Sequence, residues 1–137
     1  MKNTHRVPTF VLGALLLTAA CKQSQPMTAS PTVPASQGTV TVSATDEGNT
    51  KVAVKVKHLA QPSKVEPDAA IYVVWIRPPS GELQSLGALK LDGDLDGTLE
   101  AVTPHRRFQL TVTPEPNQQV VGPSHPPVFT AEVDRLD

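Results

Sequence analysis

The sequence predicts an all-β fold, an immunoglobulin-like antiparallel β-sandwich of about seven strands. The first observation is an uninterrupted run of apolar, aromatic and β-branched residues at 71–76 (IYVVWI), which is typical of a strand covered on both faces. The second is strict alternation of apolar and polar residues in several other segments, which is typical of strands with one buried face. The third is a count of 14 prolines, which disfavours long helices.

The length of 137 residues indicates one domain with short appendages. Hydrophobic residues make up 39% of the chain, which is enough for a sandwich core filled mainly by Val and Leu. The formal net charge of −1 offers no basic face to nucleic acid. We expect a monomer and no nucleic-acid partner.

Residues 1–20 have the features of a lipoprotein signal peptide. Lys2 and Arg6 are followed by a long uncharged stretch of signal-peptide length, short for a membrane-spanning helix. Small residues at 18–20 then stand before Cys21, the only cysteine, and this order resembles a bacterial lipobox with Thr where Leu is usual. The resemblance implies cleavage before Cys21 and a covalent lipid, palmitate among its acyl chains, on this residue. An ordinary secreted protein is the alternative.

A lipid on Cys21 would anchor the protein in the cell envelope, facing the periplasm or the exterior. By the same resemblance, Lys22 in place of Asp points to the outer membrane where a cell has two membranes. Residues 21–37 are rich in Ser, Thr, Gln and Pro and lack hydrophobic periodicity. We therefore expect a disordered linker between the anchor and the domain.

The sandwich domain is expected at residues 38–137 and begins with a hairpin. Residues 38–45 and 50–59 alternate, with the turn sequence DEGN between them. The inward positions are Val40, Val42, Ala44, Val52, Val54 and Val56. Lys51, Lys55 and Lys57 face outward, as a solvated row that discourages edge pairing or, alternatively, as a stripe that binds acidic groups.

The central strand, at residues 70–79, follows a proline-containing loop at 60–68 and ends in a Pro-Pro-Ser-Gly turn. We expect Trp75, the only Trp, near the centre of the core between the two sheets. Residues 82–91 form the next predicted strand, with Gly87 at a bulge or a close backbone contact.

Three predicted strands complete the domain, at residues 97–102, 106–113 and 128–133. The inward face of the second of them carries Phe108, Leu110 and Val112. A long proline-rich loop, residues 114–127, joins the last two strands.

The second half of the chain shows an order of features that resembles the extracytoplasmic domain of anti-sigma-K factors. These features are Tyr72 with Trp75, Leu86-Gly87, Phe108, Val112-Thr113-Pro114-Glu115-Pro116, Gly122-Pro123 and Pro127-Val128. The sequence departs from that family at Asn117-Gln118-Gln119, where Gly-Gly-Ser is usual. We expect no sigma-binding region and no membrane helix before the domain. The resemblance therefore implies a β-rich envelope module without carried-over anti-sigma activity.

Asp92, Asp94 and Asp96, followed by Gly97, fit the first half of a calcium loop, because carboxylates this close repel unless a cation lies between them. The second half does not fit, since Thr103 stands where a bidentate Glu is required. The alternative is a polar hairpin connection, in which Asp and Gly are common. We expect no metal and no cofactor other than the lipid.

The sequence predicts no catalytic group. His58, His105 and His125 lie far apart and lack the spacing of a zinc site. Ser124 and His125 are neighbours on an extended chain, so their side chains should point apart. Arg106-Arg107 is interpreted as one exposed and one carboxylate-paired residue, the alternative being contact with an anionic partner.

These observations predict a non-enzymatic, membrane-anchored envelope lipoprotein whose β-sandwich is an interaction or structural module. Contact surfaces are expected at residues 78–81 and 114–127, because loops on a rigid scaffold carry binding sites more than the scaffold does. The partner would be an envelope protein or a glycan. The alternative function is a sensory or regulatory accessory related to anti-sigma-K systems.

Overall fold

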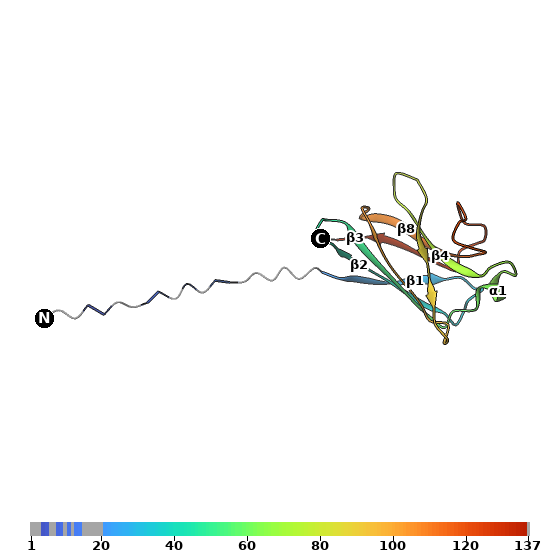
Figure 1. The fold of residues 1–137 in the computed structure, drawn as a ribbon, viewed down its shortest axis with the longest axis horizontal. Coiled ribbons are helices and arrows are strands. Elements are labelled where there is room, and N and C mark those ends of the chain that lie inside the picture. The colour runs from blue at the N-terminus through green and yellow to red at the C-terminus, as the bar shows by residue number, and fades with distance from the viewer. Residues whose placement is uncertain (1–3, 6–7, 10, 12, 15–20, 137) are drawn as a thin grey trace.

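The computed structural model describes residues 4–5, 8–9, 11, 13–14 and 21–136. This part of the chain forms nine antiparallel strands and one short helix, and the strands make two sheets that pack face to face (Figure 1). The elements are β1 (Gln23–Ala29), β2 (Gln37–Ala44), β3 (Thr50–Lys57), α1 (Pro62–Val65), β4 (Ile71–Arg77), β5 (Gln84–Ala88), β6 (Lys90–Leu91), β7 (Gly97–Thr103), β8 (Arg107–Glu115) and β9 (Phe129–Asp134). The strands are hydrogen-bonded in one continuous order, β5-β4-β8-β9-β1-β2-β3-β7-β6, in which β1 is shared by the first sheet, β1-β2-β3-β7-β6, and the second sheet, β5-β4-β8-β9-β1. The predicted all-β sandwich is confirmed.

The predicted alternation is confirmed in the core between the sheets. The first sheet contributes Val40, Val42, Val52, Val54 and Val56, and the second contributes Tyr72, Val74, Ile76, Phe108, Leu110 and Val112. None of these side chains is more than 2% exposed. Lys51, Lys55 and Lys57 point outward from β3 into solvent, as expected. Apolar periodicity alone therefore assigns most core positions correctly.

β1 corrects the prediction of a disordered linker at residues 21–37. Its first part pairs with β2 from Gln23 to Met27, and its last residues pair with β9. Met27 is buried and pairs with Gly38, and a side chain at Gly38 would collide with both Met27 and Phe129. The composition of residues 21–37 did not indicate this strand, because β1 is held by backbone hydrogen bonds to two neighbouring strands and by hydrogen bonds from its polar side chains to backbone groups. The Nε2 of Gln25, for example, donates to the carbonyl of Glu132 at 2.7 Å.

Trp75 is buried, at 2% exposure, but it does not lie in the core between the two sheets. Successive side chains of β4 point to opposite faces, so Tyr72, Val74 and Ile76 enter the core while Val73 and Trp75 face outward. The uninterrupted apolar run was correctly interpreted as covered on both sides. On the outer face the indole of Trp75 bonds to Thr113, which is linked through Glu115 to Ser124 in the loop at residues 116–127.

The strand predicted at residues 82–91 is two strands, β5 and β6, which belong to different sheets. Because the chain passes from the second sheet to the first between β5 and β6, the two sheets together nearly form a closed barrel. The predicted irregularity at Gly87 is confirmed, because Val74 pairs with Gly87 while Trp75 pairs with Ser85, which leaves Leu86 as the extra residue of a bulge. Gly87 has φ of +128°, in the left-handed region that favours glycine.

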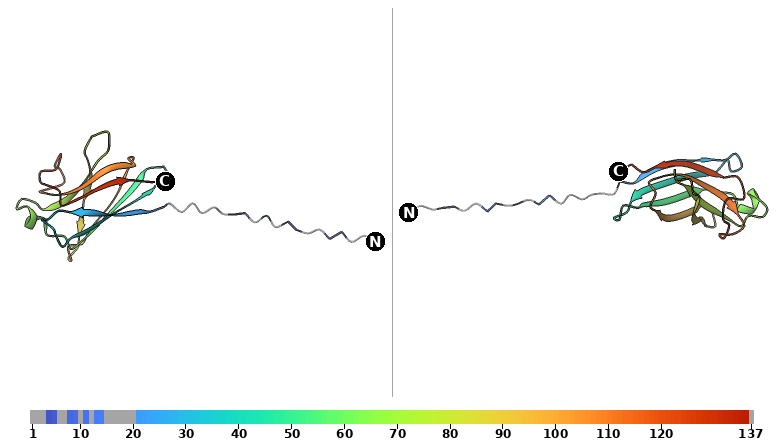
Figure 2. Two further views of the ribbon diagram at one scale, coloured as in Figure 1. Left: turned by 180° about the vertical axis from the view of Figure 1, so that it is seen from behind. Right: turned by 90° about the horizontal axis from the view of Figure 1, so that it is seen from above.

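The two ends of the sandwich carry different parts of the chain (Figure 2). At one end β1 begins beside the end of β9, where the Nε2 of Gln23 donates to the carbonyl of Asp134 at 2.9 Å. Cys21 is exposed just before this point. α1 and the loop at residues 116–127 lie at the opposite end (Figure 1). α1 is a four-residue helix with Pro62 in its first turn, which the sequence analysis did not predict.

The predicted signal peptide, residues 1–20, lies largely outside the described residues. Among the residues that are described, no helix has the length and apolar character that a membrane crossing requires.

Candidate functional site

The outer face of the second sheet carries a groove that runs between two proline-containing loops. One part, of about 290 Å³, is lined by Arg77, Leu83, Thr111, Thr113, Pro123 and Pro127. A second part, of about 350 Å³, is lined by Pro78, Pro79, Gly81, Arg107 and Glu132. Both parts share Arg77 and Gln109, so they adjoin along β4 and β8. We call the two parts together the outer-face groove.

The alternation of β8 explains why this face is polar. Phe108, Leu110 and Val112 point into the core, so the residues between them point outward. These outward residues are Gln109, Thr111 and Thr113. Gln109 and Thr111 offer side-chain hydrogen-bonding groups along the floor of the groove, whereas the Thr113 hydroxyl is bonded to Trp75 and Glu115.

The loop after β4 is held at one side of the groove by Arg77. Its Nη1 donates to the carbonyl of Gly81 at 2.8 Å, and the Gly81 amide donates to the carbonyl of Pro78 at 2.9 Å. Gly81 has φ of +95°, which explains why glycine ends this turn. Arg77 is exposed, so its guanidinium is at the groove surface while it holds the loop.

The loop at residues 116–127 is held by Glu115, whose side chain is 0% exposed. One carboxyl oxygen accepts from the hydroxyl of Thr113 at 2.8 Å and from the amide of Ser124 at 2.9 Å. The other oxygen accepts from the Ser124 hydroxyl. A buried carboxyl group is stable only when its oxygens are satisfied in this way. These contacts fix the second wall of the groove.

Trp75 continues the same hydrogen-bond network into the sheet. Its indole Nε1 donates to the Thr113 hydroxyl oxygen at 2.9 Å, and that hydroxyl donates in turn to Glu115. The ring therefore has one polar partner and is shielded from water beside the loop, which is the environment that a buried indole requires. The sequence analysis named Thr113 and Glu115 only as part of the resemblance to anti-sigma-K factors and gave them no role, although their spacing of two residues in a strand places both on one face.

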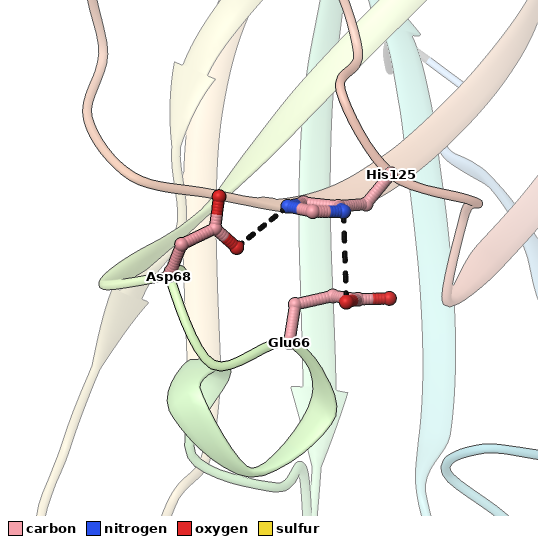
Figure 3. A group of neighbouring side chains, drawn as sticks. All are labelled: Glu66, Asp68 and His125. Carbon is pink, nitrogen blue, oxygen red and sulfur yellow. Dashed lines mark hydrogen bonds and ion pairs between the residues drawn. The ribbon is translucent and has the colours of Figure 1, made fainter.

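A second cluster joins the loop to the segment after α1 (Figure 3). The Nε2 of His125 lies 2.8 Å from the Oδ1 of Asp68, and its Nδ1 lies 3.6 Å from the Oε2 of Glu66. Among the described residues, this is the one group of three or more His, Cys or acidic side chains whose ligand atoms converge. Sequence spacing could not reveal it, because 57 residues separate His125 from Asp68.

The three aspartates that suggested a calcium loop form a turn instead of a converging group. The Oδ1 of Asp92 accepts from the amides of Asp94 and Asp96 at 2.9 Å and 3.0 Å. The Oδ1 of Asp96 accepts from the amide of His58 at 3.1 Å. Two of the three carboxylates thus complete the backbone hydrogen bonding of the turn, the role that Asp commonly has in turns.

The remaining candidate residues are separate. His58 lies at this turn, His105 lies beside Gln84 at 3.2 Å, and His125 lies in the cluster described above. The Ser124 hydroxyl bonds to Glu115 and not to His125. Arg107 forms an exposed ion pair with Asp134 at 2.9 Å, as expected of one of the two arginines.

Comparison of this chain with protein-family models, with curated proteins and with solved structures returned no match.

Proposed function

We propose that this protein is a non-enzymatic, lipid-anchored binding protein of the bacterial cell envelope, and that its partner lies in the outer-face groove. The observation that carries the proposal is a groove whose two loop walls are each fixed by specific hydrogen bonds, through Arg77 and through Glu115. A binding surface built on such fixed loops loses little conformational entropy when it is occupied.

The anchor supports this arrangement through the position of Cys21. This residue is exposed and stands two residues before β1, so a lipid there would hold the sandwich by the end where β1 begins. The opposite end, with α1 and the loop at residues 116–127, would then point away from the membrane (Figure 1). A signal-like segment before the only cysteine supports lipidation of that cysteine.

The lining favours an extended segment of another envelope protein as the occupant. Thr111 and Gln109 provide donors and acceptors for a peptide backbone, while the proline rings and Leu83 provide apolar contact. Both aromatic side chains of β4, Tyr72 and Trp75, are buried and offer no ring face to a sugar. A glycan partner is therefore the less favoured alternative.

The test is crosslinking of the protein in its own membrane, followed by identification of the crosslinked species. Thr111→Arg would fill the groove without touching the core, and Thr98→Arg, on an exposed position of β7, is the matched control. We expect Thr111→Arg to lose a species that Thr98→Arg keeps. Identical species from both variants would contradict binding in the groove, and a species sensitive to glycosidase would identify a glycan.

A separate variant tests the anchor. Cys21→Ser should move the protein from the membrane fraction to a soluble or uncleaved form while its fold stays unchanged. Native protein that carries no fatty acid would contradict lipidation.

A further inference from the structure

We propose that Glu66, Asp68 and His125 form a binding site for one divalent transition-metal ion, with Zn²⁺ as the best-fitting member of that class. The three ligand atoms lie within 4.8 Å of one another, and they come from two segments far apart in the sequence (Figure 3). This site is separate from the outer-face groove, and the inference does not rest on the proposed function.

Both halves of the site are held in place before any ion binds. Glu66 precedes Pro67 and His125 precedes Pro126, so both stand at positions that the following proline restricts to extended conformations, and Asp68 follows the fixed φ of Pro67. Glu115 connects the halves, because its carbonyl accepts from the amide of Ala70 at 2.9 Å while its carboxyl group holds Ser124. A site that is already ordered needs less free energy to close around an ion.

The donor set decides the class of metal. One imidazole nitrogen and two carboxylate oxygens suit Zn²⁺ and similar divalent ions, whereas Ca²⁺ and Mg²⁺ prefer sites made of oxygen alone. The side chains of His125, Glu66 and Asp68 are 18%, 32% and 61% exposed, so water can complete the coordination. Three protein ligands with one open position is a common arrangement for zinc.

The observed distances are close to those that an ion needs. Two ligand atoms that each lie about 2.1 Å from an ion in a tetrahedral site are about 3.4 Å apart. The widest pair must therefore approach by up to about 1.4 Å, and the Nε2 of His125 and the Oδ1 of Asp68, now 2.8 Å apart, must separate by about 0.6 Å. Asp68 is the most exposed of the three side chains and so has the most freedom to adjust. The ion would displace the proton that lies between the Nε2 of His125 and the Oδ1 of Asp68, and this proton would be released to solvent, since a metal binds neutral imidazole only through a nitrogen that carries no proton.

The experiment is titration of the full-length protein with ZnCl₂ by calorimetry, together with thermal unfolding in the presence of Zn²⁺ and, separately, of Ca²⁺. We expect one Zn²⁺ per chain in the micromolar range and a rise in Tm that Ca²⁺ does not produce. His125→Ala and Asp68→Asn should each weaken Zn²⁺ binding by at least about tenfold. His105→Ala, a matched histidine outside the cluster, and Asp94→Asn, in the aspartate turn, should leave it unchanged.

Trp75 provides an internal check that the variants are folded. It is the only Trp, and it lies on the sheet beside the loop, so its emission reports whether that loop is still in place. A blue emission maximum in His125→Ala, combined with loss of Zn²⁺ binding, would support the site. Absence of Zn²⁺ binding in the wild-type protein, or binding that survives His125→Ala, would overturn it.

Discussion

Replacement of Glu115 by Ala should destabilise the protein strongly, because this fully buried side chain connects the loop at residues 116–127 to the sheet. The change removes three hydrogen bonds, from the Thr113 hydroxyl, the Ser124 amide and the Ser124 hydroxyl. A hydrogen bond lost with its donor left buried is worth about 1 kcal/mol or more, and the lost methylene packing adds about 1 kcal/mol. We therefore expect the free energy of unfolding to fall by about 3–5 kcal/mol.

Glu115→Gln separates the shape of the side chain from its hydrogen bonding. The amide oxygen can keep the contacts to Thr113 and to the Ser124 amide, and the NH₂ group can donate to the Ser124 hydroxyl, which also accepts. One N–H is then left without an evident partner, so a loss of only about 1 kcal/mol is expected.

Urea unfolding followed by Trp75 emission is the assay, since the indole is 2% exposed and bonds to the same network. Glu132→Ala removes a carboxylate from an exposed position of β9 and should change stability by less than about 0.5 kcal/mol. If Glu115→Ala were no more destabilising than this control, the network would not hold the loop, and the account of the groove wall would be wrong.

Three further outcomes can be measured by unfolding experiments. Met27→Ala should lower the free energy of unfolding by about 2–4 kcal/mol, because Met27 is buried in the domain. Thr28→Ala, at an exposed position of β1, should change it little. Equal and negligible effects of the two variants would indicate that β1 does not belong to the folded domain. Trp75→Ala should lower the free energy of unfolding by about 3–5 kcal/mol, and its unfolding is followed by circular dichroism because this variant lacks the only Trp. Red-shifted emission from wild-type Trp75 in the native state would contradict its burial. Burial raises the pKa of Tyr72 to about 12 from an ordinary value of 10.0. The unfolded chain therefore loses this proton first, so stability is unaffected below about pH 10 and falls by about 3 kcal/mol as the pH rises to about 12. Tyr72→Phe should lack this part of the alkaline loss, and an identical loss in both proteins between about pH 10 and about pH 12 would exclude Tyr72 as its source.

The sequence predicted the strands best where one face is apolar, as in β2, β3 and β8. Val52, Val54 and Val56 are buried as the period of two requires, because each of these side chains must leave water through the same face of the sheet. β1 was missed for the opposite reason. Its side chains are mostly polar, and its place in the fold comes from backbone pairing with β2 and β9, which no local pattern records.

The candidate sites depended on the structure more than the strands did. The two proline-containing loops were predicted as contact surfaces, and they do form the walls of the outer-face groove. The roles of Arg77 and Glu115 in holding these loops, and the cluster around His125, were not predicted. The role of Glu115 and the cluster depend on contacts between segments that are distant in the chain, and residue spacing carries no information about such contacts.

Local chemistry was sufficient for the all-β class, the hairpin of β2 and β3, and the bulge at Gly87, since apolar periodicity and glycine conformation act within a few residues. The tertiary structure alone decided that Trp75 lies on the outer face of β4. A run of apolar residues shows that both faces of a strand are buried, but it does not show which elements cover each face. The tertiary structure also decided that Glu66, Asp68 and His125 meet, since the free energy that brings them together comes from packing of the whole sandwich and not from the residues themselves.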